Sequence, residues 1–311
     1  MIKKDAFGKR LKRDINRNLG AYIMVIPVLA FYILFAYRPM FGAIIAFKNF
    51  SPARGIFWSP WAGNFGFQHF LDFFNSFFFV RTLRNTITIS LAGIAFGFPI
   101  PIILALLINE VKNRYFKRVV QTISYMPHFI SLVVVCSMVY LFTSENAFIV
   151  QIMQFFGYRG TQNLLNIPQF FVPIYVISGI WQSAGWSSII YLAALSSVDM
   201  ELYEAARIDG AGRLRQTFVV TLPALLPTIV LLFILSIGGI MNVGFEKIIL
   251  LYNSFVMETA DVISSYVYRR GLVNGNWSFS TAVGLFNSVI NFTLVVVANR
   301  ISRKITGKGL W

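Results

Sequence analysis

Long apolar runs separated by short polar segments make up most of this chain. Six of these runs are each close to the length of α-helix that crosses about 30 Å of hydrocarbon. They lie at residues 19–41, 82–108, 120–142, 170–195, 222–245 and 281–299. The fifth run stays apolar beyond Glu246, which leaves open a longer helix that reaches Leu251. The pattern predicts an all-α integral membrane protein with six transmembrane helices.

The first run is predicted to be a retained membrane span rather than a signal peptide. Residues 1–18 are strongly basic, and a basic start before an apolar core is found in both. The run has about the twenty residues that a span needs, and no small-x-small cleavage site follows it. The chain therefore divides into a basic cytoplasmic N-terminus at 1–18 and a transmembrane domain at 19–311.

Lys and Arg side chains indicate which ends of the helices face the cytoplasm. The N-terminus, the loop around Lys112, the polar segment around Arg213 and the C-terminus hold about twice as many basic residues as the other loops. Basic residues accumulate on the cytoplasmic side of membrane proteins. Both termini and the polar segment at 199–223 are therefore predicted to be cytoplasmic.

Composition supports the membrane assignment and removes other classes of protein. The chain is 57% hydrophobic and 13% charged, whereas soluble domains are about half apolar and a quarter charged. The net charge of +15 would suit nucleic acid, but the basic residues lie in short runs between apolar segments, so no nucleic-acid partner is predicted. Cys136 is the single cysteine, which excludes an internal disulfide and a thiol metal site.

Sequence motifs of the common enzyme classes are absent. Gly8-Lys9 and Gly307-Lys308 lack the rest of a phosphate-binding loop, so the chain is not predicted to hydrolyse ATP. Neither Gly-x-Ser-x-Gly nor His-Glu-x-x-His occurs. No paired acids lie in mid-span, as an intramembrane protease or a proton relay would require. The chain is therefore predicted not to be an enzyme.

The segment 199–223 is polar although it lies between two long apolar runs. Asp199 suits the N-cap of a short helix, and Gly210 suits the left-handed turn that would end it. Pro223 is tolerated in the first turn of the following apolar helix. The pattern predicts a short cytoplasmic helix held between two spans. An ordinary solvated loop is the alternative.

This segment resembles the EAA loop of ABC-importer permeases. Glu204-Ala205-Ala206, Gly210 and Leu222-Pro223 have the spacing of that loop, with Val220 where the family more often has Ile. In that family the loop is the coupling helix that docks on a cytoplasmic ATPase. The resemblance implies ATPase-coupling roles for Glu204, Ala205, Ala206, Asp209, Gly210, Leu222 and Pro223. It also implies the type I ABC importer permease fold.

Two shorter segments, 37–52 and 244–253, resemble the complex oligosaccharide and polysaccharide branch of the maltose-type, binding-protein-dependent carbohydrate permeases. The resemblance implies a permease in the bacterial cytoplasmic membrane that imports oligosaccharides and forms half of the translocation pathway. The implied partners are a second homologous permease, two ATPase subunits that hold ATP and magnesium, and an extracytoplasmic solute-binding protein. No cofactor is expected in this chain. A secondary transporter or channel that works without an ATPase remains the alternative.

Polar side chains inside the fourth run are candidates for substrate contacts, because polar groups that face lipid are costly. Gln182 and Trp186 are four residues apart and share a helical face, as do Ser183 and Ser187. An indole can stack on a sugar ring, while amides and hydroxyls bind its hydroxyl groups. The alternative is that the indoles only fill gaps between helices.

The fifth run supplies the remaining candidates. Asn242 and Glu246 are four apart, and an acid at this depth needs a partner or water. A structural salt bridge of Glu246, for example to Lys247, is the alternative. Counting along the chain from the coupling loop, the resemblance to maltose-type permeases implies sugar contacts in the same two regions. The predicted substrate-binding residues are Gln182, Ser183, Trp186, Met241, Asn242 and Glu246.

Overall fold

The computed structural model describes residues 14, 15, 17–307, 309 and 310. Within them the protein is helical, apart from one antiparallel bridge between Lys48 and Trp61. Most of the predicted basic segment 1–18 lies outside the described residues.

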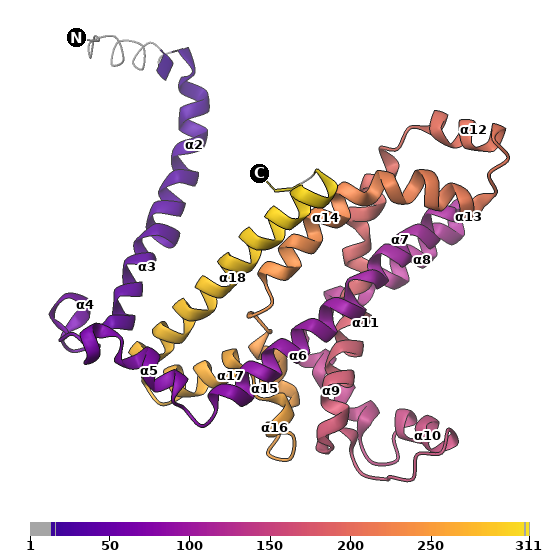
Figure 1. Cartoon of the computed structure of the whole chain (residues 1–311). Coiled ribbons are helices and arrows are strands. Elements are labelled where there is room, and N and C mark those ends of the chain that lie inside the picture. The colour runs from indigo at the N-terminus through magenta and orange to yellow at the C-terminus, as the bar shows by residue number, and fades with distance from the viewer. Residues whose placement is uncertain (1–13, 16, 308, 311) are drawn as a thin grey trace.

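The N-terminal half begins with one continuous helical stretch, which short elements and then longer helices follow (Figure 1). The continuous stretch consists of α2 Leu19–Phe31, a π-helical segment Tyr32–Tyr37, α3 Arg38–Met40 and a 3₁₀ segment Phe41–Phe47. Short elements follow: α4 Gly55–Trp58, a 3₁₀ turn Asn64–Gly66 and α5 Gln68–Phe74. Then come α6 Phe79–Gly97, α7 Pro99–Glu110, α8 Arg114–Tyr125, a 3₁₀ turn Met126–Phe129, α9 Leu132–Thr143, α10 Phe148–Phe155 and a 3₁₀ turn Leu164–Asn166.

The C-terminal half contains the two longest helices. Its elements are α11 Pro168–Ser196, α12 Met200–Ile208, α13 Arg213–Gln216, a π-helical segment Thr217–Thr221, α14 Leu222–Gly238, α15 Phe245–Leu251, α16 Met257–Ala260, α17 Ile263–Tyr268, a π-helical segment Arg269–Val273 and α18 Trp277–Thr306. The central helix is α11, which packs against α6, α7, α8, α9, α14 and α16.

Four continuous helical stretches of the described chain are long and apolar enough to cross a membrane. They are Leu19–Phe47, Phe79–Glu110, Arg213–Gly238 and Trp277–Lys304. A fifth arises if Arg114–Phe129 and Leu132–Thr143 count as one span. The position of α11 agrees with the predicted fourth run, but its polar side chains keep its hydropathy below that of the other spans. The prediction of six spans is thus confirmed for four or five of them.

The prediction of one regular helix over 120–142 is wrong, because the two parts of this span meet at a bend of 99°. Pro127 has no N–H to donate, which weakens the helix at this point. Ser131 then starts a new helix, since its hydroxyl oxygen accepts the N–H of Val134 at 3.4 Å.

The helix found at the fifth apolar run differs from the predicted range 222–245 at both ends. The helix begins at Arg213 rather than at Leu222, and a π-helical segment before Pro223 accommodates the proline inside a continuous span. The span ends at Gly238, so it does not run on to Leu251. Asn242 therefore lies outside any helix, so its spacing of four residues from Glu246 does not place the two side chains on one helical face.

Small residues and a proline shape the α6–α7 stretch. The helix is interrupted at Phe98, immediately before Pro99. A Cβ on Gly97 would lie 3.6 Å from Ile180 of α11, so this glycine packs closely against a neighbouring helix. Gly93 has open space beside it instead.

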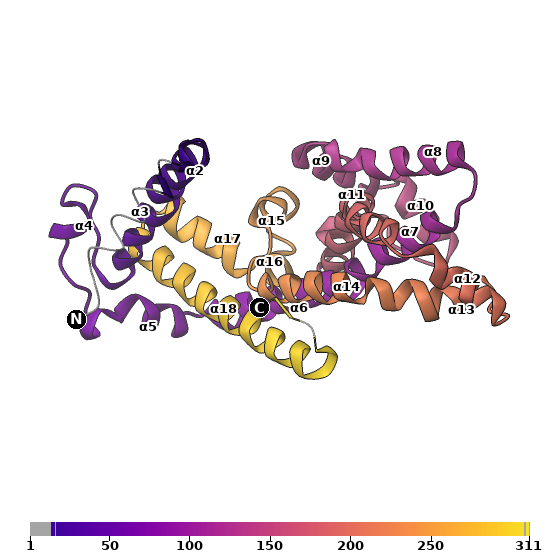
Figure 2. The same cartoon turned by 90° about the horizontal axis from the view of Figure 1, so that it is seen from above.

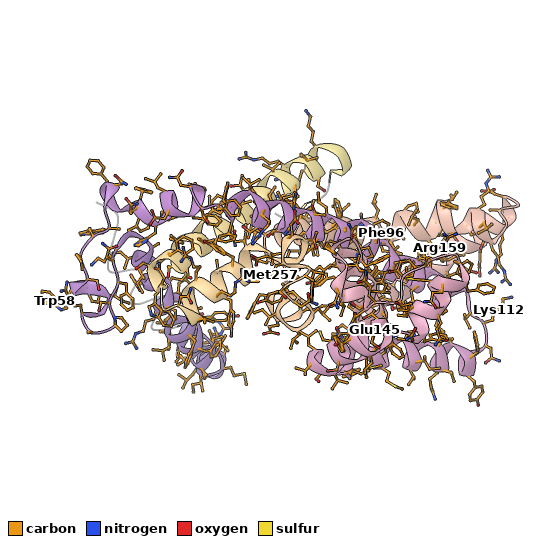
Figure 3. The ribbon with its side chains drawn as sticks, turned by 90° about the horizontal axis from the view of Figure 1, so that it is seen from below. Trp58, Phe96, Lys112, Glu145, Arg159 and Met257 are labelled. Atoms are coloured by element: carbon orange, nitrogen blue, oxygen red, sulfur yellow. The ribbon has the colours of Figure 1, made fainter. Side chains whose placement is uncertain are left out.

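The described elements are distributed between two ends of the molecule. Figure 1 shows α12, α13 and the C-terminal end of α18 towards one end, and α4, α10 and α16 towards the other. Seen from above, α17 and α18 lie towards α2 and α3, whereas α8, α9 and α10 lie on the opposite side of α15 (Figure 2). Trp58 of α4 and Lys112 of the α7–α8 loop lie at opposite extremes in Figure 3. None of the α2 residues is buried within this chain.

Candidate coupling helix and translocation cavity

The short helix α12 has the beginning and the end that the sequence predicted. At its start, Asp199 accepts the backbone N–H of Glu201 at 3.0 Å. At its end, Gly210 adopts a left-handed conformation with φ of +76°, and the N–H of Ala211 returns to the carbonyl of Ala206 at 2.9 Å. Local sequence chemistry therefore fixes both boundaries of this helix.

The outer face of α12 is open to a partner. Ile208 is 87% exposed, and Leu202 is also exposed. Figure 1 shows the helix projecting beyond α13. A side-chain contact joins α12 to the base of the next span, because the hydroxyl groups of Tyr203 and Thr221 lie 3.0 Å apart.

The predicted coupling residues divide into accessible and inaccessible ones. Those exposed on the loop or at the start of α14 are Glu204, Ala205, Asp209, Gly210 and Pro223. Leu222 is half-buried, and Ala206 is buried against its own chain. A partner that docks on this loop therefore meets a mixed surface of carboxylates and apolar side chains.

A cavity of about 850 Å³ lies between α6, α7, α11 and α14. We call it the central cavity. Its lining includes Gly93, Gly97, Tyr175, Gly179, Ser183, Trp186, Ser187, Tyr191 and Ser236. Ligand pockets commonly measure about 300–1,000 Å³ and combine an apolar wall with a few polar groups. The central cavity has both properties.

Trp186 connects the central cavity with the bend between α8 and α9. Its ring stacks on His128, with the ring centres 4.6 Å apart and the planes at 4°, and Phe129 meets its edge at 5.5 Å. One helical turn away, the Gln182 amide nitrogen donates to the carbonyl of Ile130 at 3.3 Å. The predicted common face of Gln182 and Trp186 is therefore directed towards this bend.

In the described part of the chain, the six predicted substrate residues lie in different surroundings. Ser183 and Trp186 line the central cavity, and Glu246 lines a smaller cavity of about 280 Å³ beside Leu132 and Tyr268. Asn242 is exposed. Met241 is buried, and the backbone N–H of Met241 donates to the Asn291 side chain at 3.1 Å. Glu246 takes part in none of the ion pairs among the described residues.

Lys247, on the buried face of α15, lies directly behind the wall of the central cavity. Its Nζ donates to the backbone carbonyl of Tyr175 at 2.9 Å and stands 4.7 Å from the centre of the Tyr175 ring. A Cβ on Gly179 would lie 3.2 Å from the same Nζ. Among the described residues, no carboxylate lies within ion-pair distance of this ammonium. A buried cation without a counter-charge makes the cavity wall electropositive.

A second excess of positive charge lies where α6 meets α17. Asp261 is fully buried and accepts from Arg269 at 2.7 Å and from Arg81 at 3.4 Å. One carboxylate therefore serves two guanidinium groups. The Nε of Arg81 and one terminal nitrogen of Arg269 are buried without a hydrogen-bond partner.

Comparison with known proteins identifies the family of this chain. Residues 97–307 match the family of the binding-protein-dependent transport system inner membrane component. The chain belongs to this family. It is a multi-pass permease of the inner membrane and the membrane component of an ABC importer, in which ATP is hydrolysed on partner chains. Like its family, the permease binds no cofactor itself. The alternative of a secondary transporter acting without an ATPase is therefore overturned.

Similar proteins cover nearly the whole permease. The polygalacturonan/rhamnogalacturonan transport system permease protein YteP of Bacillus subtilis is 43% identical over 304 residues, which are 97% of this chain and 94% of YteP. Protein LplB of the same organism is 42% identical over 298 residues, 96% of this chain and 92% of LplB. A solved bacterial alginate ABC transporter, in complex with a periplasmic protein that holds an alginate pentasaccharide, contains a chain with a TM-score of 0.86 and 42% identity, covering 97% of this chain and 100% of that one.

Proposed function

We propose that this permease imports acidic oligosaccharides as one half of a heterodimeric translocation pathway. Its partners are a second homologous permease, two ATPase subunits and an extracytoplasmic solute-binding protein. The relatives support the substrate class, since one transports polygalacturonan, a uronate polymer, and a second solved structure concerns import of the acidic polysaccharide alginate. The solved complex with a pentasaccharide-loaded periplasmic protein supports the role of a binding protein.

The observation that carries the mechanism is the capped, projecting helix α12 (Figure 1). Its capped ends and its contact with Thr221 transmit a displacement of the helix to the base of α14 instead of absorbing it. ATP-driven closure of the ATPase subunits moves α12 and, through it, the spans that enclose the central cavity. The membrane helices thereby alternate between inward-open and outward-open arrangements.

The proposed topology has six spans with both termini and α12 in the cytoplasm. The sixth span is α11, whose 29 residues are long enough to cross the bilayer and whose polar side chains line the central cavity instead of lipid. The common end shared by α12 and the C-terminal end of α18 supports this arrangement (Figure 1).

A second permease completes the pathway. The helix α2 has no buried residue in this chain, and the predicted sugar contacts are spread over more than one cavity. In the proposed heterodimer, the oligosaccharide passes between the two permeases and contacts Gln182, Ser183, Trp186, Met241, Asn242 and Glu246 as the spans rearrange.

Purification and uptake measurements on the whole complex test this function. The permease is expected to co-purify with an ATPase, and uptake of uronate oligosaccharides is expected to require the binding protein and ATP hydrolysis. Import that persists with a hydrolysis-deficient ATPase contradicts the proposal, as does exclusive import of a non-carbohydrate solute.

Charge selection is expected to depend on Lys247. Because its ammonium has no carboxylate partner in the described chain, its field favours a uronate in the central cavity. At an effective dielectric constant of about 20, two unit charges about 8 Å apart interact by about 2 kcal/mol, so Lys247→Met is expected to reduce uptake of uronate oligosaccharides about tenfold or more at limiting concentration. Uptake of the same glycans with reduced, neutral carboxyl groups is expected to change little.

Lys48→Met provides a matched control for this prediction. Lys48 is also buried, but its Nζ binds the carbonyls of Ile56 and Phe57 in the segment before α5, away from the central cavity. This variant is expected to keep the ratio of acidic to neutral uptake. An unchanged ratio in Lys247→Met, measured at normal assembly, contradicts the electrostatic role of Lys247.

A further inference from the structure

A second cavity, of about 410 Å³, lies between α15, α17 and α18. We call it the outer pocket. Six of its lining residues define its chemistry: Phe245, Ser264, Tyr268, Trp277, Thr281 and Asn287. None of them is among the substrate residues that the sequence predicted.

Aromatic rings form one part of the outer pocket. The rings of Phe245 and Tyr268 stack with their centres 5.4 Å apart and their planes at 27°. Trp277, at the first position of α18, is 39% exposed and also lines the pocket. Aromatic faces bury large apolar area with a defined geometry, and the C–H face of a sugar ring matches such a surface.

Hydrogen-bond acceptors form the other part. The Ser264 hydroxyl donates to the carbonyl of Val243 at 2.7 Å, and the Thr281 hydroxyl donates to that of Trp277 at 2.8 Å. A hydroxyl group has one proton and two acceptor lone pairs. Since these protons are already used inside the chain, both oxygens offer only acceptor capacity to a ligand.

Asn287 provides the observation that points to a ligand. Asn287 lines the outer pocket and is 9% exposed, and its Oδ1 is buried without a hydrogen-bond partner among the described residues. Buried polar atoms are nearly always paired, and an unpaired one costs free energy. The missing partner is a donor that the described chain does not supply.

A ligand that fits this pocket has several O–H donors and an apolar face. A sugar ring has both. The unpaired Oδ1 of Asn287 needs a donor such as a hydroxyl group, which a carboxylate or phosphate anion does not provide because its oxygens only accept. A lipid acyl chain would cover the rings but leave Asn287 unpaired.

We propose that the outer pocket is a sugar-binding subsite of the permease, which holds the hydroxyl-bearing edge of one ring of the oligosaccharide. This inference rests on the proposed function and adds a site to it. In the subsite, the ring stacks on the aromatic wall, and its hydroxyl groups donate to Asn287, Ser264 and Thr281. Lys247 selects the carboxylate, whereas the outer pocket binds the uncharged part of the sugar.

The position of the pocket gives it a place in the transport sequence. Phe245 and Tyr268 also line the smaller cavity that contains Glu246, so the two spaces share a wall. Figure 1 shows α15 and α17 towards the end of the molecule opposite α12. In the proposed topology this end is extracytoplasmic, and a sugar delivered by the binding protein reaches the outer pocket before the central cavity.

Cysteine protection tests the subsite directly. Thr281→Cys in a Cys136→Ser background replaces one small side chain by another in the whole reconstituted complex. A uronate pentasaccharide and its carboxyl-reduced form are both expected to slow labelling of Cys at position 281 by a small maleimide, by about three- to tenfold at saturation. Ser288→Cys, on an exposed turn of the same helix and outside the pocket, is the control whose labelling is expected to stay constant.

A substitution tests the role of the unpaired amide. Loss of one hydrogen bond of about 0.5–1.5 kcal/mol predicts that Asn287→Leu raises the oligosaccharide concentration for half-maximal ATPase stimulation about two- to tenfold. The change is expected to be equal for the acidic and the carboxyl-reduced glycan, unlike that of Lys247→Met. Asn274→Leu, the same change at an exposed position outside the pocket, is the control.

The outcomes separate this inference from the proposed function. If a complex that imports the glycan shows no protection at position 281, or protection by lipid alone, the subsite is overturned while the importer stands. If Asn287→Leu fails to assemble, the labelling of the Thr281→Cys complex still decides. If the complex imports no oligosaccharide at all, the proposed function fails first.

Discussion

Replacing Gly210 by proline is expected to abolish import while the spans remain assembled in the membrane. Gly210 ends α12 with φ of +76°, and its N–H donates to the carbonyl of Arg207 at 2.9 Å. Proline fixes φ near −65° and has no N–H, so it meets neither condition. The end of α12 and the direction of the following loop must change, which removes the docking surface for the ATPase.

The measurement compares uptake and ATPase co-purification for Gly210→Pro and Gly212→Ala. Gly212 lies two residues further along the same loop, with φ of −66° and open space beside it, so alanine fits there without strain. The control is expected to transport normally, and Gly210→Pro is expected to lose uptake to background. Adding Glu204→Ala removes a carboxylate from the exposed surface of α12 and is expected to complete the loss. Normal uptake by an assembled double variant contradicts the coupling role of α12.

The helix α12 could be predicted in detail because its signals are local. Asp199 and Gly210 act on backbone groups within four residues of themselves, and sequence spacing is enough to place them. The approximate positions of the spans follow from apolar length in the same way. These parts of the structure depend little on what the rest of the chain does.

The interruptions of the spans were harder to predict, because average hydropathy does not register them. The 99° bend depends on Pro127 and on Ser131 capping a new helix, within a run that is apolar on both sides. The segment between Gly238 and Gly244 likewise leaves the helix although the run stays apolar. In both places a few backbone hydrogen bonds decide the geometry.

The candidate site was found only in part from the sequence. Ser183 and Trp186 were identified by their polarity inside a span, and they line the central cavity. Lys247 was considered only as a partner for Glu246, although a basic residue within an apolar run is itself a functional signal. The role of Asn287 depends on contacts between α15, α17 and α18, which no spacing along the chain reveals.

Close packing at glycines also depends on contacts between helices that spacing along the chain does not reveal. Gly185 makes the tightest glycine contact of the described α11, and its position along the chain does not reveal this. A Cβ placed on Gly185 would overlap the backbone carbonyl of Ser124 in α8. This approach holds α8 beside the α11 turn that carries Trp186, and Trp186 in turn stacks on His128.

Gly185→Ala is therefore expected to destabilise the permease strongly and to reduce its assembly with the partner subunits. The overlapping group is backbone, so relief requires α8 and α11 to separate rather than one side chain to rotate. Overpacking of this kind costs about 1–3 kcal/mol or more, and separation of the helices also breaks the stacking of Trp186 on His128. The thermal midpoint of the purified complex and the yield of assembled complex measure the effect.

Gly93→Ala is the matched control, since the same methyl group meets nothing within 4 Å at that position of α6. Alanine is favoured over glycine inside a helix by about 0.5–1 kcal/mol, so this variant is expected to keep or slightly raise the thermal midpoint. The two alanine variants differ only in what the added carbon meets. Equal thermal midpoints for both would show that the α8–α11 contact does not hold the bend beside the central cavity, because a close contact there must respond to one carbon atom.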